Sequence, residues 1–186
     1  AKKLGMPLWR LFGGSRREIN LSYTLTSKEP ADLPAEIERA RKAGYRHFNF
    51  KIGMEPDHDI EMARTIRKTV GDGPFVWADA NGAYNVATAL RQVGRLADAG
   101  VNVFEQPVAP GDRLGLQRLC ATAAIPIGVD ESLISPDDLM QLLNMRAVSI
   151  VVGKVTRCGG LLPARQIYDL GRAAGLPLLL SGLTDA

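Results

Sequence analysis

Cysteine is scarce in this 186-residue chain, and the two that occur, Cys120 and Cys158, form no paired spacing with each other or with histidine. Such usage is typical of a reducing compartment, so we expect a cytoplasmic protein. Long hydrophobic runs are also missing, because the apolar stretch at residues 176–180 is short and contains a proline, and we expect no membrane partner. The chain shows no signal peptide and does not start with methionine, which suggests a piece of a longer polypeptide.

No charge of one sign dominates. The 23 lysines and arginines nearly balance the 20 aspartates and glutamates, and the net charge is only +3. Aromatic residues make up 6% of the chain and are not interleaved with the basic ones. Because nucleic-acid-binding surfaces are usually strongly basic, often with aromatic residues among the cations, we expect no nucleic-acid partner. A content of 46% hydrophobic and 23% charged residues is that of an ordinary globular protein.

Short apolar runs alternate with amphipathic segments along almost the whole chain. The pattern predicts strands at residues 20–25, 47–52, 75–78, 101–104, 125–129, 148–152 and 178–180. Between them it predicts helices that start after Asp32, at 59, 86, 114, 136 and 162, with Ser135 as the cap of the helix that begins at Pro136. Glycines or prolines punctuate most of the junctions, as expected for strand–helix units.

Strands this apolar need helices on their outer side, which favours a parallel α/β sheet. Seven units of about 25 residues make up most of a (β/α)8 TIM-type barrel, which typically needs about 250 residues. We therefore expect an incomplete barrel with seven of its eight strands at residues 20–186, preceded by a helix and loop at 1–19. The alternative is a doubly wound open sheet, which usually places its site at a single switch point.

Five polar residues recur at the ends of successive apolar runs: Lys51, Asp79, Glu105, Asp130 and Lys154. Their spacings of 28, 26, 25 and 24 residues each correspond to one strand, one helix and two short loops. Because the carboxyl ends of parallel strands meet at one mouth of a barrel, we expect these side chains to lie together.

The three carboxylates are hard oxygen ligands, which suit Mg²⁺ or Mn²⁺ better than zinc. Taken singly, each could instead cap the following helix. The two lysines could be ion-pair partners of the carboxylates, or desolvated acid/base groups, and the two roles are compatible. Because Lys51 and Lys154 flank the carboxylates in strand order, a substrate on the metal would present one face to each lysine.

These residues stand in a set of ordered motifs. They are Phe50-Lys51-Ile52-Gly53, Asp79-Ala80-Asn81, Glu105-Gln106-Pro107, Asp130-Glu131-Ser132 and Lys154 followed by Gly159-Gly160. Together with the segment at residues 1–14, the set resembles the enolase superfamily, and within it the muconate lactonizing enzyme subgroup of the mandelate racemase type. The resemblance covers essentially the whole chain.

The resemblance implies a magnesium-dependent isomerase or lyase that removes the proton α to a substrate carboxylate and stabilises the enediolate. Racemases, epimerases, cycloisomerases and dehydratases of this kind act on small-molecule carboxylates, and we expect a homo-oligomer. By resemblance, the metal ligands are Asp79, Glu105 and Asp130, and the acid/base pair is Lys51 and Lys154. Further residues expected to contact substrate or support the site are Asn49, Asn81, Glu131 and Ser181.

Two departures from the family pattern stand out. Asn49 occupies the first position of the usual Lys-x-Lys motif and shares a face with Lys51. We expect the missing cation to leave Lys51 a stronger but more often protonated base. The family's N-terminal capping domain and eighth strand are not in this sequence, so we expect a fragment of a larger enzyme. The alternatives are a Schiff-base aldolase-like barrel that uses Lys51 or Lys154, or a non-catalytic remnant.

Overall fold

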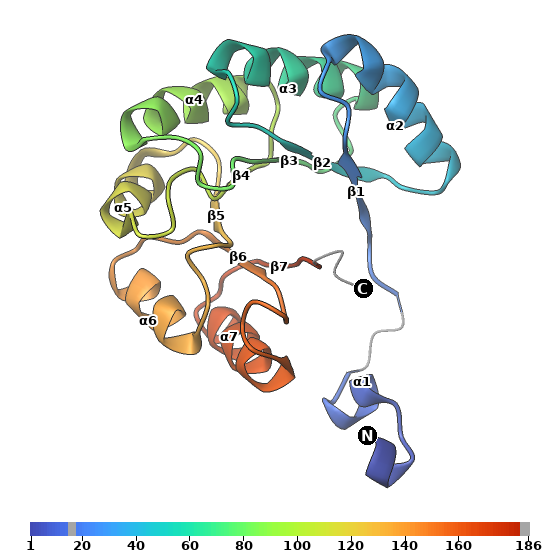
Figure 1. The fold of residues 1–186 in the computed structure, drawn as a ribbon, viewed down its shortest axis with the longest axis vertical. Helices are drawn as coiled ribbons and strands as arrows, with labels where there is room; N and C mark the ends of the chain where they lie inside the picture. The colour runs from blue at the N-terminus through green and yellow to red at the C-terminus, as the bar shows by residue number, and fades with distance from the viewer. Residues whose placement is uncertain (15–17, 183–186) are drawn as a thin grey trace.

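The computed structural model describes residues 1–14 and 18–182, and it contains one curled sheet wrapped by helices (Figure 1). The sheet has seven parallel strands in the order β1 to β7. They are β1 Ser22–Leu25, β2 His47–Lys51, β3 Val76–Asp79, β4 Val103–Glu105, β5 Ile127–Val129, β6 Ile150–Gly153 and β7 Leu178–Leu180. The expected seven-stranded incomplete barrel is confirmed, because a doubly wound sheet would reverse its strand order, and this sheet does not.

The helices line the outer side of the curl (Figure 1). They are α2 Leu33–Lys42, α3 Pro56–Val70, α4 Val86–Asp98, α5 Arg113–Thr122, α6 Pro136–Asn144 and α7 Leu161–Ala173, with a short 3-10 turn η2 Pro30–Asp32 before α2. Near the N-terminus, η1 Lys2–Leu4 and α1 Leu8–Leu11 lie apart from the curl (Figure 1). This segment contacts α7, where the Arg165 guanidinium lies over the Phe12 ring. Residues 15–17 and 183–186 of the two expected units lie outside the described residues.

Both faces of the sheet bury apolar side chains, because successive strand residues point to opposite sides. On the outer face, residues such as Phe48, Phe50 and Phe104 are fully buried against the helices. On the inner face a smaller cluster fills the curl, made of Val103, Ile150 and Val152 with Phe75, Trp77 and Leu179 packed against it. This double burial explains why the strands are nearly continuous apolar runs.

The strand register brings the polar strand ends to one level. Directly paired residues form a row through Lys51, Asp79, Glu105, Gly128 and Ile150. Asp130, directly after β5, lies two residues beyond this row, and Lys154, directly after β6, lies four residues beyond it. An offset of four residues over four strands fits a barrel with a shear of about eight over eight strands. Because the strands of such a barrel are tilted, residues with this offset in register lie at the same height and meet at one mouth.

Some helix starts differ from the expectation. Asp32, which directly precedes α2, does not cap it: it has helical dihedral angles, makes no side-chain capping bond and is the last residue of η2. Helix α3 begins at Pro56, three residues earlier than expected, because the Glu55 side chain accepts a bond from the N–H of His58. The cap of α6 by Ser135 is confirmed, and Asp138 completes a capping box.

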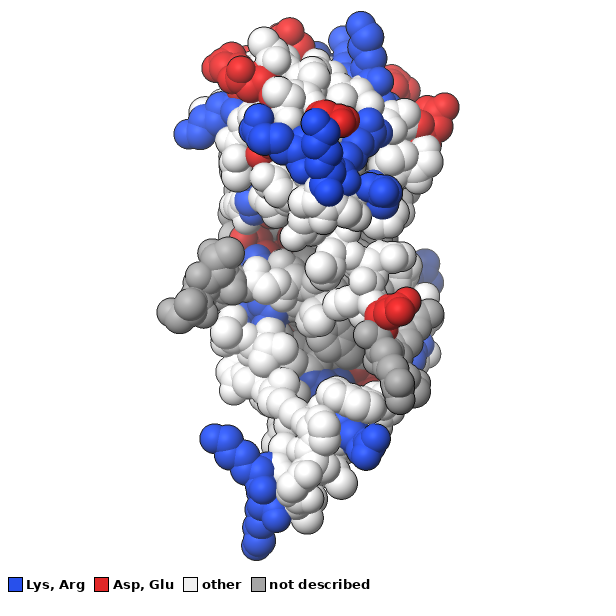
Figure 2. All heavy atoms as spheres, turned by 90° about the vertical axis from the view of Figure 1, so that its right-hand side faces the viewer, with Lys and Arg blue, Asp and Glu red and all other residues white. Residues whose placement is uncertain are grey.

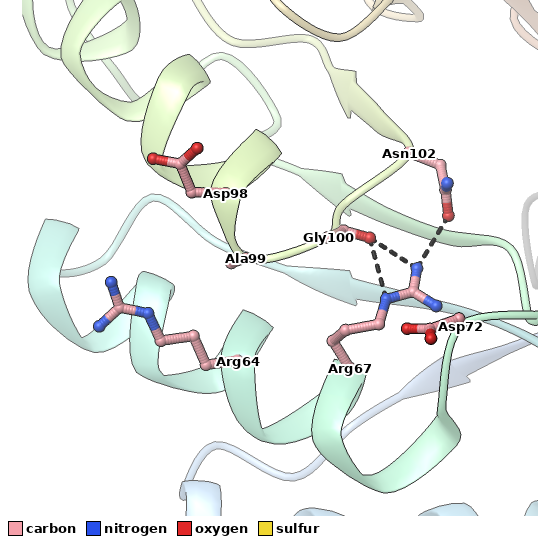
Figure 3. A pocket seen from close by; sticks show the side chains of 7 residues that line it. All are labelled: Arg64, Arg67, Asp72, Asp98, Ala99, Gly100 and Asn102. Carbon is pink, nitrogen blue, oxygen red and sulfur yellow. Dashed lines mark hydrogen bonds between the residues drawn. The ribbon is translucent and has the colours of Figure 1, made fainter.

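The N-terminal ends of the strands are held by Arg67 of α3. Its guanidinium donates to the carbonyl oxygen of Gly100 and to the side-chain oxygen of Asn102 (Figure 3). It also donates to the carbonyl oxygens of Gly71 and Pro74. A hollow of about 490 Å³ lies beside these contacts. It is at the opposite end of the strands from the carboxylates. The guanidinium is bonded mainly to backbone carbonyl oxygens, so we assign Arg67 a structural role at the N-terminal ends of the strands.

The charged surface is uneven. On the side of the molecule that carries α2, lysine and arginine side chains gather on the upper part with acidic side chains around them, and the middle is mostly uncharged (Figure 2). None of the described helices is long and apolar enough to cross a membrane.

Candidate metal and acid/base site

Three carboxylates meet inside the mouth of the curl. Asp79 and Glu105 are the last residues of β3 and β4, and Asp130 follows β5 directly. All three are buried, and each offers an oxygen that lies within 4.8 Å of the others. The interval of about 25 residues predicts this meeting, because each repeat delivers one residue to the same end of the next strand.

Lys51, at the end of β2, pairs with the first carboxylate. Its Nζ lies 2.5 Å from Asp79 Oδ2, while Asp79 Oδ1 accepts a bond of 2.8 Å from the N–H of Asn81. The Lys51 side chain is 53% exposed. Of the two compatible roles expected for the lysines, the ion pair with a carboxylate is present at Lys51, while more than half of its side chain stays open to solvent.

Lys154, which follows β6, is 8% exposed and pairs with Asp130. Its Nζ donates to Asp130 Oδ2, and Arg157 donates to Asp130 Oδ1, so both oxygens of this carboxylate face cations. Burial raises the pKa of Asp130, while the Lys154 and Arg157 charges act against that rise. The two lysines thus differ, since one is open to solvent and the other is enclosed.

Glu105 lies between the other two carboxylates and is the least neutralised of them. Within the described part of the chain its side chain has no hydrogen-bond or ion-pair partner. Burial raises the pKa of Glu105 to about 8, and the neighbouring charges of Asp79 and Asp130 contribute to the rise. A carboxylic acid in this position holds its proton near neutral pH, until a cation offsets the crowded negative charge.

Asn81 and Glu131 lie next to the carboxylates and contact each other. The Asn81 side chain donates to Glu131 Oε1 at 2.8 Å, and Arg157 lies 3.7 Å from the same oxygen. Glu131 Oε2 is buried without a hydrogen-bond partner among the described residues. Both of these expected site residues are therefore brought to the carboxylate cluster.

Asn49 and Ser181 lie further from it. Asn49 Oδ1 accepts a bond of 2.9 Å from the Thr24 hydroxyl, one pleat below Lys51 on the same face of β2. Ser181 follows β7, where its N–H donates to the carbonyl of Gly153 at 3.0 Å. The structure shows no contact of either side chain with the three carboxylates.

Sequence reasoning missed two residues of the site, Arg157 and Gln106. Arg157 stands three residues after Lys154, in the turn that leads to α7, and that short spacing was the available signal. Gln106 follows Glu105 directly and is completely buried, with hydrogen bonds to the loop after β5. An amide next to a site carboxylate gives little signal without knowledge of the tertiary contacts.

The arrangement fits a divalent cation. Three buried oxygen donors converge, one of them carries no cationic partner, and all are the hard ligands that Mg²⁺ and Mn²⁺ prefer. An amine stands on either side, at Lys51 and Lys154. A site of this composition can hold a metal ion and move protons on two sides of a bound molecule.

Comparisons with known proteins agree with this geometry. The sequence pattern of the family described as Enolase C-terminal domain-like matches residues 32–184. The chain is 36% identical to o-succinylbenzoate synthase of Geobacillus kaustophilus, covering 100% of this chain and 49% of that protein. It is 35% identical to muconate cycloisomerase 1-2 of Acinetobacter lwoffii, covering 96% and 47%.

Among solved structures, the dipeptide epimerase from Cytophaga hutchinsonii, complexed with Mg and the dipeptide D-Ala-L-Val, superposes with a TM-score of 0.91. The two are 27% identical, and the match covers 97% of this chain and 50% of that one. The chain thus spans about half the length of the relatives it matches. With the family pattern matching most of its residues, the chain belongs to the enolase C-terminal domain-like family, as a barrel of the muconate lactonizing enzyme type.

Proposed function

We propose that this chain carries the metal site and the acid/base groups of an enzyme that removes the proton next to a substrate carboxylate. The observation that carries the proposal is the cluster of three buried carboxylates with a lysine on each side. Racemases, epimerases, cycloisomerases and o-succinylbenzoate synthases among the relatives support this class of chemistry.

In this proposal Asp79, Glu105 and Asp130 hold Mg²⁺, and Mn²⁺ can replace it. The Mg named in the complex of the related dipeptide epimerase supports the choice of ion. When bound, Mg²⁺ supplies the positive charge that offsets the charge developing on a carboxylate as its α-proton leaves. The three carboxylates would fix the position of the ion.

Lys51 and Lys154 take and return the proton. They lie on β2 and β6, on opposite sides of the carboxylates, so each serves one face of the substrate carbon. Their contacts with Asp79 and Asp130 hold each ammonium at the edge of the metal site. The Schiff-base alternative gives no role to the three buried carboxylates, so their cluster favours the metal-dependent proposal over it.

The substrate class is a small carboxylate with a proton on the adjacent carbon. In this proposal Asn81 and Glu131, beside the metal ligands, support the substrate, and Asn49 on β2 and Ser181 after β7 are further candidates for contact with it. Rearrangement by proton return on the other face gives an epimerase or racemase, and loss of a β-substituent gives a lyase.

The first test of the proposal is metal binding. We expect the protein to bind Mn²⁺ with one site in calorimetric titration and in electron paramagnetic resonance, and Asp79→Asn and Asp130→Asn each to weaken binding at least tenfold. Asp57→Asn on the exposed surface of α3 is the matched control and should bind as the wild type does. A wild-type protein without a Mn²⁺ site would be a non-catalytic remnant, and the proposal would fail.

The second test follows the proton. With Mg²⁺ in D₂O, we expect the epimers D-Ala-L-Val and D-Ala-D-Val to exchange the α-proton of the valine residue, measured by proton NMR. Lys51→Ala should abolish exchange for one epimer and Lys154→Ala for the other, while Lys42→Ala on the exposed side of α2 retains both. Undiminished exchange of both epimers in both variants would refute the two-base scheme.

A further inference from the structure

A buried glutamine joins the segments that follow β3, β4 and β5, the three strands whose ends bear the carboxylates. Gln106 follows Glu105 at the end of β4 and is 0% exposed. Its side chain makes four hydrogen bonds to protein groups. The proposed chemistry gives it no role.

The Gln106 amide uses its whole hydrogen-bonding capacity. Its Oε1 accepts from the N–H groups of Asp130 at 3.0 Å and Ser132 at 3.1 Å. Its Nε2 donates to the carbonyl of Val108 at 2.9 Å and to the Ser132 hydroxyl at 2.8 Å. An amide can make two bonds at its oxygen and donate two from its nitrogen, so no site remains free for a ligand.

The backbone of the same residue reaches the third loop. The Gln106 carbonyl accepts from the N–H of Gly82 at 2.8 Å, three residues after Asp79. Its own N–H donates to the carbonyl of Gly128 on β5 at 2.9 Å. Gln106 therefore lies in the segment after β4 and contacts the segments after β3 and β5, next to all three carboxylates in the chain.

The backbone at Gln106 is also unusual. Its φ of 36° lies in the left-handed region, which L-residues other than glycine and asparagine rarely adopt. Such a conformation persists only where surrounding contacts enforce it. The four side-chain bonds supply that enforcement here, so the local geometry depends on the amide itself.

We propose that Gln106 is a positioning residue that sets the mutual placement of Asp79, Glu105 and Asp130 for metal binding. The inference rests on the proposed function, because it concerns the same metal site. Removing the amide frees the N–H groups of Asp130 and Ser132, and the loop after β5 moves relative to β4. Residues that orient metal ligands typically change metal affinity by about 10–100-fold when they are replaced.

The test compares two buried glutamines. Gln106→Leu removes the amide at similar volume, and Gln92→Leu on α4 is the matched control, because Gln92 is 1% exposed and bonds to Pro56 and Arg95 away from the mouth. Both variants lose buried hydrogen bonds, so both should be less stable to thermal unfolding. Only Gln106→Leu should weaken Mn²⁺ binding, by at least about tenfold, and broaden the Mn²⁺ resonance spectrum.

Hydrogen exchange on the metal-free protein gives a readout that does not need the ion. In Gln106→Leu the amides of residues 130–132 should exchange faster, and in Gln92→Leu they should not. Ser132→Ala removes the hydroxyl that accepts from Nε2 and donates to the Pro110 carbonyl, and it leaves both bonds to Gln106 Oε1 in place. It is the milder variant if Gln106→Leu does not fold, and it should lose several-fold in Mn²⁺ affinity.

The outcomes separate the two proposals. Unchanged Mn²⁺ affinity in Gln106→Leu, with a loss of stability like that of Gln92→Leu, would show a purely structural glutamine and overturn the inference. If the wild type itself binds no Mn²⁺, the proposed function fails, and hydrogen exchange alone decides on Gln106. Unchanged exchange at residues 130–132 would then overturn its positioning role.

Discussion

Glu105 differs from Asp79 and Asp130 because no described cation contacts its side chain. Its pKa rises from an ordinary value of 4.5 to about 8, mainly through burial. In the unfolded chain the group ionises at the lower value, so the metal-free folded state holds a proton that the unfolded state has released. The contribution of Glu105 to stability is therefore complete below the unfolded pKa and is lost as the pH rises through about 8.

A bound divalent cation requires the ionised carboxylate, so metal binding must displace this proton. We predict that Mn²⁺ affinity rises by about tenfold per pH unit between pH 6 and 8 and levels off above that range. Calorimetry in buffers of different ionisation enthalpy measures both the affinity and the released proton. Glu105→Gln should bind more weakly and lose most of the pH dependence. A constant affinity across this range in the wild type would contradict the assignment.

Among the elements, α6 shows how a local signal fixes a helix that carries no site residue. The Ser135 side chain and the N–H of Asp138 form a capping box, and Arg113 of α5 pairs with the same aspartate at 2.5 Å. Burial alone would raise the pKa of Asp138, but the bonds from Ser135 and Arg113 outweigh it and lower the pKa. This stabilisation is present above the unfolded pKa and is lost as the pH falls through the folded one.

We predict that Ser135→Ala lowers the free energy of unfolding by about 1 kcal/mol, because one N-terminal N–H of α6 loses its partner. Asp138→Ala should cost more, since it removes the cap and the contact with α5 together. Urea unfolding at pH 7 measures both, and Asp137→Ala, which makes neither contact, is the control. Equal stability of the Ser135 and Asp137 variants would show that the cap contributes nothing.

The order of strands and helices could be predicted from the sequence, because short apolar runs and amphipathic segments are local patterns that do not depend on distant contacts. Their exact ends could not. Asp79 and Glu105 were expected just after their strands, yet both lie within them, because ladder bonds continue from the N–H groups of Ile52 and Ala80 to their carbonyls. Such pairing is a property of the neighbouring strand, which a local pattern does not contain.

The same dependence on tertiary contacts decides which site residues could be predicted from the sequence. The five polar strand ends could be predicted from their spacing, since the register follows from regular strand–helix units. Arg157 and Gln106 could not, because their roles arise from contacts with residues 24 to 27 positions away in the chain. The difference in exposure between Lys51 and Lys154 could not be predicted either, because it depends on the tertiary packing around each side chain.

For the molecule as a whole, the site residues come from strands β2 to β6, and the two edge strands, β1 and β7, contribute none of the five. The sheet curls far enough for β2 and β6 to face each other across the mouth (Figure 1). The carboxylates are therefore assembled by interior strands whose neighbours on both sides are present. This is why we expect the metal site to form in this chain, although its relatives are about twice as long.

The unequal shelter of the two lysines has a consequence for isotope labelling. A proton taken up by Lys51, at 53% exposure, is in contact with bulk water, whereas one taken up by Lys154, at 8%, is screened from it. We predict that a deuterated substrate attacked on the Lys154 side returns part of its label to product, and that label taken by Lys51 washes out. Mass spectrometry of product formed in ordinary water from each deuterated epimer measures this. Equal retention of deuterium from both epimers would contradict the prediction. Unequal retention would mean that Lys154 returns the hydrogen it removed, whereas Lys51 exchanges it with water first.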